Sequence, residues 1–211
     1  MTDLPTSPAS EFDRQYAVEQ LRRSRHPLRR FIKGFYLRNV LRHVRGPSID
    51  FGCGAGQLLE LLPPGSVGME VNPHLIAQLR GVGLTVHEAR ADLRDFELIG
   101  FAPGVFRTLV IAHVLEHLVD PIEALRLLLV ACRRIGIERV VLVVPGARGY
   151  ASDRTHKTFI DRAFLEDRMP KVSDGFARSS LTYFPFPWEW MGRHFIYQEM
   201  KVVFDRIGEA A

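Results

Sequence analysis

Short apolar runs rich in β-branched residues alternate with amphipathic segments between Ser48 and Pro145, and this alternation constrains the fold more than any other feature. We expect strands in SIDFGC, SVGMEV, LTVHEA, TLVIAHV and RVVLVVPG, and helices in AGQLLELL, NPHLIAQLRGVG and DPIEALRLLLVACRRIG. Apolar strands separated by helices are typical of a parallel sheet that is covered on both faces. The pattern therefore predicts a doubly wound, Rossmann-like α/β fold.

The segments on either side of this core have other patterns. Residues 1–10 predict a disordered tail, and helices are expected over 11–25 and 28–44, the second opened by Pro27. After Pro145 a polar loop, GARGYASDRTHKT, leads to a short helix, FIDRAFLEDRM. Two late strands, FARSSLTYFPFP and QEMKVVFDRI, have no helix between them and predict an antiparallel hairpin that closes the sheet.

We therefore expect one domain over residues 11–211. It comprises an N-terminal helical cap (11–46), a cofactor-binding core (47–145) and a part on the substrate side (146–211) with the loop, the helix and the closing hairpin.

Composition limits the class of protein. The chain is 46% hydrophobic and 25% charged, which is ordinary for a globular protein. It has no apolar stretch approaching the roughly 18 residues of a membrane span, and its first residues lack the pattern of a secretory signal. The two cysteines, Cys53 and Cys132, form no CxxC pair. These features predict a cytoplasmic protein.

Positive charge is concentrated near the N-terminus. Nine Lys or Arg residues and no acid lie between Gln20 and Arg45, in a chain whose net charge is +4. One interpretation is a surface for anionic lipid, nucleic acid or a phosphorylated substrate. The other, which we favour, is a solvated helix face opposite a buried stripe that consists of Leu28, Phe31, Ile32, Phe35 and Val40.

A glycine-rich turn follows the first expected strand. Gly52, Gly54 and Gly56 remove side chains from a loop at the start of a helix, where backbone N–H groups favour negative charge. The frame is G-x-G-x-G, with Gln57 where the dinucleotide fingerprint G-x-G-x-x-G needs its third glycine. This offset argues against NAD and FAD, and the lack of Gly-Lys-Ser/Thr excludes a P-loop.

Acidic residues lie near the ends of successive strands. Asp50 is in the first strand, and Glu70 ends the second, where a carboxylate accepts the hydroxyls of a nucleoside ribose in many nucleotide folds. Asp92 follows the third strand and is a candidate for an adenine amine, with Asp95 as a rival. A nucleoside-bearing cofactor is the prediction that these positions favour.

Four motifs in order, DFGCGAG, GMEVNP, ADLRDF and IAHVLEHLVDP, resemble those of class I S-adenosylmethionine-dependent methyltransferases. The resemblance covers about residues 48–145 and, more loosely, the final hairpin. It implies a seven-stranded sheet with an antiparallel last strand and S-adenosyl-L-methionine as cofactor. Many relatives carry an Asp near the start of the fourth strand, and Phe106-Arg107-Thr108 has none.

The resemblance also implies positions for the parts of the cofactor. The glycine turn would pack against its methionyl part, Glu70 would bind ribose, Asp92 and Leu93 would lie near adenine, and His113 would lie beside the sulfonium. The expected cofactor-binding residues are Asp50, Gly52, Cys53, Gly54, Gly56, Glu70, Val71, Asp92, Leu93 and His113.

Methyl transfer from a sulfonium is an in-line displacement, so the protein chiefly aligns the acceptor and, where needed, supplies a base. Histidine is suited to this role near neutral pH. We expect His117 and His156 as catalytic residues with Glu116 as their orienting partner, and His113 is a further candidate base. In HVLEHL, residues 113, 116 and 117 share one face only if a helix begins by His113.

A metal site is an alternative for the same residues. His113, Glu116, His117 and His156 are a set that is able to bind a divalent metal. The arrangement is similar to small-RNA 3′-terminal 2′-O-methyltransferases, in which a Glu-x-x-Glu-His block and a later His hold a metal. Here His113 replaces the first Glu and the rest of that signature is absent, so our expected site contains no metal.

The aromatic stretch LTYFPFPWEW offers either a wall for a flat or greasy acceptor or a cover for a sheet face. Trp188 and Trp190 lie in the connection, where we expect them to be exposed. We predict a methyltransferase for a small-molecule or lipid-like acceptor. The alternatives are a metal-assisted RNA 2′-O-methyltransferase, with nucleic acid as a less favoured partner, and a non-catalytic binding module with the same fold.

Overall fold

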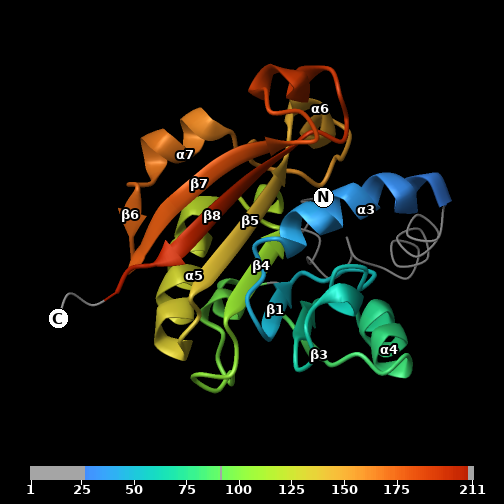
Figure 1. The fold of residues 1–211 in the computed structure, drawn as a ribbon, viewed down its shortest axis with the longest axis vertical. Helices are drawn as coiled ribbons and strands as arrows, with labels where there is room; N and C mark the ends of the chain where they lie inside the picture. The colour runs from blue at the N-terminus through green and yellow to red at the C-terminus, as the bar shows by residue number, and fades with distance from the viewer. Residues whose placement is uncertain (1–26, 91, 209–211) are drawn as a thin grey trace, which may run out of the picture.

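A computed structural model describes residues 27–90 and 92–208 of the chain (Figure 1). The expected tail over 1–10 and the expected helix over 11–25 lie outside these residues. Within the described part, no helix is both long enough and apolar enough to cross a membrane. Cys53 and Cys132 are buried and free.

Five parallel strands form the centre of one sheet. They are β1 (Ser48–Phe51), β2 (Val67–Glu70), β3 (Val86–Glu88), β4 (Thr108–Ala112) and β5 (Arg139–Pro145). Along the sheet the order is β3-β2-β1-β4-β5. The chain moves outward from β1 to β3 and then returns to β4 on the other side of β1. In such sheets, ligands bind at the carboxyl ends of the strands where the order reverses.

The C-terminal strands complete the sheet as predicted. β8 (Glu199–Arg206) runs antiparallel to β5, and β7 (Phe176–Phe184) runs antiparallel to β8. The resulting order, β3-β2-β1-β4-β5-β8-β7, has the expected seven strands and closing hairpin. A two-residue strand, β6 (Val172–Ser173), pairs with the outer edge of β7 as an eighth.

Helices cover both faces of the sheet, which confirms the doubly wound prediction. Along β5, Val140, Leu142 and Val144 pack in a core that includes α5 (Pro121–Ile135) and Leu165 of α7 (Arg162–Arg168). Val141 and Val143 point to the opposite core, which includes residues of α3 (Pro27–Leu41) and α4 (Pro73–Gly81). The alternation follows from the period of two in a strand.

Local sequence signals fix where the helices begin and end. Asn72 and Asp120 cap α4 and α5 with their side chains, and each is followed by a proline at the first helical position. Gly136 ends α5 with a φ of 85°, a conformation that glycine adopts without a Cβ penalty.

Two predicted segments differ from the structure. The helix expected in AGQLLELL is only a 3-10 turn, η1 (Leu59–Leu61), because Pro63 and Pro64 follow at once and a chain preceding proline avoids helical angles. The loop expected after β5 contains a short helix, α6 (Ala147–Ala151).

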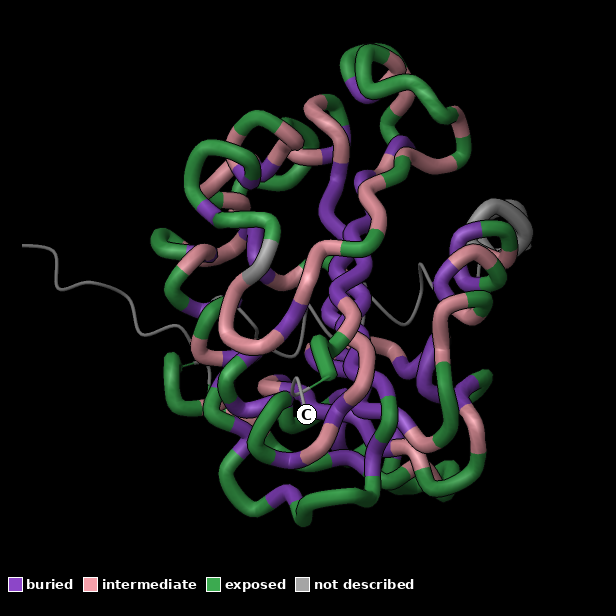
Figure 2. The backbone as a smooth tube through the Cα atoms, turned by 60° about the vertical axis from the view of Figure 1, so that its left-hand side comes forward, coloured by how far each residue is buried: buried purple, intermediate pink, exposed green. Residues whose placement is uncertain are grey.

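The predicted buried stripe of the N-terminal helix was wrong at one position. Phe35 is 49% exposed, while Tyr36, Leu37 and Val40 are buried against the sheet. The side chains of Leu28, Phe31 and Ile32 lie outside the described set. Figure 2 shows the burial along the chain: the central strands are buried, and the lobe at the top of the molecule is largely exposed.

Candidate active site

The glycine turn is held against the end of β2. The N–H groups of Gly52 and Cys53 both donate to the carbonyl of Met69, at 2.9 Å. Gly52, Gly54 and Gly56 have φ values of 76°, 54° and 77°, in the left-handed region that favours glycine. All three positions therefore require glycine for backbone reasons alone.

The three glycines face different surroundings. A Cβ at Gly52 would lie 2.4 Å from Val114 Cγ2, and one at Gly56 would lie 2.4 Å from Leu79 Cδ2. A Cβ at Gly54 would meet nothing within 4 Å. Gly52 and Gly56 thus allow the turn to pack on neighbouring segments, and only Gly54 presents an open side to a ligand.

Glu70 ties the turn to the sheet. Its side chain is buried, with 7% of the residue exposed. Oε2 accepts from the N–H of Gly54 at 2.8 Å, and Oε1 accepts from the N–H groups of Val71 and Asn72 at 2.9 Å each. Burial raises the pKa of Glu70, and the three backbone hydrogen bonds act to lower it.

The hydrogen bonds of Glu70 limit what else it can bind. A carboxylate offers about four acceptor positions, two on each oxygen. The backbone uses both on Oε1 and one on Oε2, so a single position remains, on Oε2. The geometry therefore suits one ribose hydroxyl better than two.

The other expected cofactor residues lie around this turn and the next strand ends. Asp50 and Cys53 are buried, and burial followed by the charges of Asp50 and Glu70 raises the pKa of the Cys53 thiol. Asp92 caps a 3-10 turn, η2 (Leu93–Glu97), by accepting from the N–H of Arg94 at 2.8 Å. The exposed side chain of Leu93 follows it. Their adenine-side role remains a prediction.

Asp95, the rival of Asp92, is occupied locally. Its carboxylate accepts from the N–H of Arg90 at 2.9 Å and from the N–H of Asp92 at 3.3 Å, which completes a capping box. This leaves Asp92 as the better of the two candidates for a contact with an adenine amine.

His113 follows β4 at the same edge of the sheet, with a φ of 58°. Its Nε2 lies 3.0 Å from Glu199 Oε1, and its Nδ1 lies 3.3 Å from Glu116 Oε1. Burial lowers the pKa of His113, but the carboxylates of Glu199 and Glu116 outweigh burial and raise it to about 10. An imidazolium has no free lone pair, so at neutral pH His113 is a fixed cation and not a base.

Two neighbours of His113 were missed by sequence reasoning. Glu199 reaches this edge because β8 runs antiparallel to β5, which pairs Glu199 with Pro145. Tyr36 is a buried residue of α3 whose ring centroid lies 6.0 Å from that of His113. Burial, followed by the charges of Glu199, Asp50 and Glu116, raises the pKa of Tyr36. Neither residue belongs to a motif, so only the fold reveals them.

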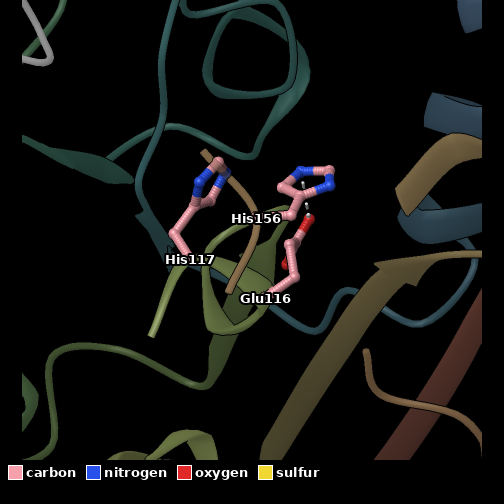
Figure 3. Close-up of side chains that lie close together, drawn as sticks. All are labelled: Glu116, His117 and His156. Atoms are coloured by element: carbon pink, nitrogen blue, oxygen red, sulfur yellow. Dashed lines mark ion pairs between the residues drawn. The ribbon is translucent and has the colours of Figure 1, made fainter. Parts of the chain in front are cut away.

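Glu116, His117 and His156 lie together, and we call them the His–Glu cluster (Figure 3). The segment HVLEHL does not form the helix that would place residues 113, 116 and 117 on one face. Glu116 and His117 belong to a 3-10 turn, η3 (Leu115–His117). The loop after α6 docks on this turn, since the N–H groups of Lys157 and Thr158 donate to the carbonyl of Glu116 at 2.8 and 3.1 Å.

The docked loop brings His156 beside the other two members of the cluster. Its Nε2 lies 3.9 Å from Glu116 Oε1, and the rings of His117 and His156 are 4.7 Å apart between centroids. Burial lowers the pKa of His117, so that imidazole is neutral and able to accept a proton at neutral pH.

The exposure predicted for the tryptophans is confirmed: Trp188 is 55% and Trp190 57% exposed. Trp190 belongs to the 3-10 turn η4 (Glu189–Arg193), and Trp188 immediately precedes it. The two rings stack on each other, with centroids 6.2 Å apart. A Cβ on Gly146 would lie 2.9 Å from Gly192 Cα, so this turn rests against the residue that follows β5. We call residues 185–197 the aromatic lobe. Tyr183, in contrast, packs against the core.

The fold and the site together define a class of protein. A doubly wound sheet carries, at its reversal point, a glycine turn with one open backbone position and a buried carboxylate at the next strand end. This is the arrangement by which α/β proteins bind a nucleoside-bearing cofactor.

Comparison with known protein families and structures narrows the class of protein further. Residues 49–137 match the family model described as "Methyltransferase domain". No curated protein sequence matches the chain significantly. Among solved structures, a SAM-dependent methyltransferase from Archaeoglobus fulgidus is similar with a TM-score of 0.66 and 19% identity, over 92% of this chain and 100% of that one.

Two further structures share the fold. The N-methyltransferase NodS from Bradyrhizobium japonicum WM9, in complex with S-adenosyl-L-homocysteine, aligns with a TM-score of 0.58 and 16% identity over 92% of this chain and 98% of its own. The small RNA methyltransferase HEN1 aligns with a TM-score of 0.53 and 13% identity over 84% of this chain, but only 25% of its own.

Residues 49–137 therefore carry a methyltransferase domain, and the chain shares the fold of the SAM-dependent methyltransferase from Archaeoglobus fulgidus. The open backbone at Gly54 and the remaining acceptor position on Glu70 fit a nucleoside with a polar tail, such as S-adenosyl-L-methionine. When bound, it supplies a methyl group on a sulfonium, which is an activated leaving group.

Proposed function

We propose that the enzyme methylates a small-molecule or lipid-like acceptor at the edge of the sheet between α3, the His–Glu cluster and the aromatic lobe. The observation that carries this proposal is that these three features meet the carboxyl ends of β4 and β5, beside the glycine turn. Tyr36 of α3 covers His113 on one side. A site bordered by these three features suits a small reacting group.

The aromatic lobe supports a greasy acceptor. Its exposed tryptophans belong to a turn that rests, through Gly192, against Gly146 after β5, next to the region where the acceptor is expected. Exposed aromatic side chains bind flat or apolar groups through large contact areas.

Cofactor binding is assigned to the glycine turn, with Glu70 accepting a ribose hydroxyl, Asp92 and Leu93 on the adenine side, and His113 near the reacting end. The remaining expected residues, Asp50, Gly52, Cys53, Gly56 and Val71, shape the turn and its surroundings. When bound, S-adenosyl-L-methionine would supply the methyl group that the acceptor receives. The proton that the acceptor loses passes to the His–Glu cluster, where His117 and His156 are the candidate acceptors.

A labelling experiment tests the acceptor class. The enzyme is incubated with methyl-labelled S-adenosylmethionine and, separately, with polar metabolites, a lipid extract and total RNA. We expect label in a small organic or lipid fraction. Label that appears only in RNA and is released by ribonuclease would contradict the proposal and favour the RNA alternative.

A single substitution tests the catalytic assignment. His156→Ala should lower turnover at least about tenfold, because general acid–base groups typically contribute 10²–10⁴-fold, and it should leave affinity for S-adenosylhomocysteine unchanged. Lys157→Ala, at the exposed neighbouring position, is the matched control. Equal turnover of the two variants would remove His156 from the catalytic residues.

A further inference from the structure

The aromatic lobe gathers exposed apolar side chains on one projection of the molecule. Trp188, Trp190, Ile196 and Tyr197 are all exposed. Figure 2 shows the lobe standing out at the top of the molecule, away from the buried central strands. Large apolar side chains that gather on one part of a surface mark a contact with another molecule or with a membrane.

The fold holds this lobe in one shape. Gln198 is fully buried, and its Nε2 donates to the carbonyls of Phe186 at 2.6 Å and of Trp188 at 3.3 Å. Near the end of the lobe, Arg148 of α6 donates to the carbonyl of His194 at 2.9 Å. The exposed rings are therefore presented on a preformed surface, so their binding costs little ordering entropy.

Positive charge accompanies the exposed rings. Arg193 of η4 is exposed and forms no ion pair within the part of the chain that the structure describes, and Arg148 is a second exposed guanidinium. The one acid of the lobe, Glu189, faces Arg162 of α7, with 3.9 Å between Oε2 and Nε. Tryptophan and tyrosine together with arginine are typical of protein surfaces that lie in the interface of a lipid bilayer.

Helix α3 adds a second basic border to the same edge of the molecule. It contains four basic residues and no acid: Arg29, Arg30, Lys33 and Arg38. Figure 1 shows α3 and the lobe in the same upper half of the molecule, and Tyr36 of α3 borders the site at His113. An anionic surface that touches the lobe is therefore also attracted by the charge of α3.

We propose that the aromatic lobe and α3 dock on an anionic lipid bilayer. Trp188, Trp190 and Tyr197 lie at the level of the lipid headgroups, Ile196 adds aliphatic contact, and Arg193 pairs with lipid phosphates. That the bilayer also delivers the methyl acceptor rests on the proposed function, whereas docking itself does not depend on the identity of the acceptor.

Other occupants match this surface less well. A two-fold contact between copies of the chain would place the same patch of each copy face to face. Arg193 and Arg148 would then meet their own counterparts, and like charges that face each other disfavour the contact. Bases of RNA stack on aromatic rings, but the aliphatic surface of Ile196 gives such stacking no benefit.

The tryptophan fluorescence of the whole protein tests the proposal, because both tryptophans of the chain belong to the lobe. The protein is mixed with vesicles of phosphatidylcholine and phosphatidylglycerol, or of phosphatidylcholine alone. With the anionic vesicles we expect emission at shorter wavelength, quenching by bromine-labelled lipid and sedimentation of the protein with the vesicles. Binding should weaken as salt is added and be at least about tenfold weaker without phosphatidylglycerol.

Removing both rings tests the part of the lobe. A variant that combines Trp188→Ala and Trp190→Ala should sediment with anionic vesicles at least about tenfold more weakly, because two large apolar side chains are lost. Ile99→Ala is the matched control, since Ile99 is exposed beside Leu98, whose carbonyl accepts from Arg134 near the end of α5. It should bind as the wild type does. Retained affinity for S-adenosylhomocysteine shows that a variant is folded.

Unchanged emission and no sedimentation with anionic vesicles would overturn the proposal, as would equal binding by the double variant and the wild type. An emission shift caused only by a higher protein concentration would replace the bilayer with a second copy, and one caused only by total RNA would replace it with nucleic acid. If the double variant does not fold, the wild-type fluorescence with the two kinds of vesicle decides. Vesicle binding with label only in water-soluble molecules would contradict delivery of the acceptor by the bilayer and leave docking in place.

Discussion

His113 lies between Glu116 and Glu199 as a cation, in a conformation that few side chains adopt. Its φ of 58° falls in the left-handed region, where Asn is the best tolerated alternative to glycine. The two carboxylates hold the imidazolium and raise its pKa to about 10. The charge of this one residue therefore links β4, η3 and β8.

This charge predicts how stability depends on pH. Because the pKa of His113 is raised on folding, its contribution is complete below about 6.5, the value in an unfolded chain, and is lost as pH rises toward 10. The free energy of unfolding should fall over this range in the wild type and fall less in His113→Asn. Denaturant titrations at several pH values measure it. Parallel curves for the two proteins would show that His113 is not held as a cation.

Single residues of the site were predictable only where a motif marks them. Glu70 and the glycines follow from strand ends and spacing, and the structure places them together at one turn. Tyr36 and Glu199 had no such signal, since Glu199 reaches the site only through the antiparallel register of β8 with β5. The approach of His156 to Glu116 and His117 likewise depends on a loop whose docking the sequence does not reveal.

At the scale of elements, the glycine turn divides its functions among its positions. Gly56 lets the turn pack on Leu79 of α4, and Gly54 leaves one side open. A substitution at either position costs backbone strain of roughly 1–2 kcal/mol, because both have left-handed φ values. Only at Gly56 does overpacking add to that strain, by up to about 1–3 kcal/mol.

The two glycines should therefore differ in their effects. Gly54→Ala is expected to weaken binding of S-adenosylhomocysteine about tenfold, equivalent to roughly 1.4 kcal/mol, with a small loss of thermal stability. Gly56→Ala is expected to lose more stability than Gly54→Ala. Calorimetry and thermal unfolding of both variants test this. Wild-type affinity in Gly54→Ala would mean that the cofactor does not approach the open side.

Most elements of the core could be predicted because β-branched runs, proline at helix starts and glycine at helix ends agree with one another. The failures came from short segments. The segment AGQLLELL runs directly into Pro63 and Pro64, which disfavour helical angles in the preceding chain, and it forms only η1. Helix α6 spans five residues with no side-chain cap, so no sequence signal marks it.

At the scale of the whole molecule, the cofactor site joins segments from both halves of the chain. The turn after β1 contacts the segment after β4 through Val114, and the neighbouring His113 contacts Glu199 of β8. A ligand that binds here should therefore stabilise both halves of the folded domain together against unfolding.

S-adenosylhomocysteine at about 100 times its dissociation constant should stabilise the protein by about 2.7 kcal/mol. For a domain of this size the melting temperature should then rise by roughly 5–10 °C. A thermal shift assay with adenosine as the comparison ligand measures this. A melting temperature that does not change with ligand concentration would argue against a native cofactor site.

The central claim is that the glycine turn and Glu70 bind the cofactor, and calorimetric titration with S-adenosylhomocysteine tests it most directly. We predict one site in the wild type, and binding in Glu70→Ala weaker by ~1–3 kcal/mol, because a charged hydrogen-bond acceptor is lost. Glu88→Ala, at the exposed end of β3, should bind like the wild type. Equal affinity of Glu70→Ala and wild type, or no binding by the wild type, would contradict the account.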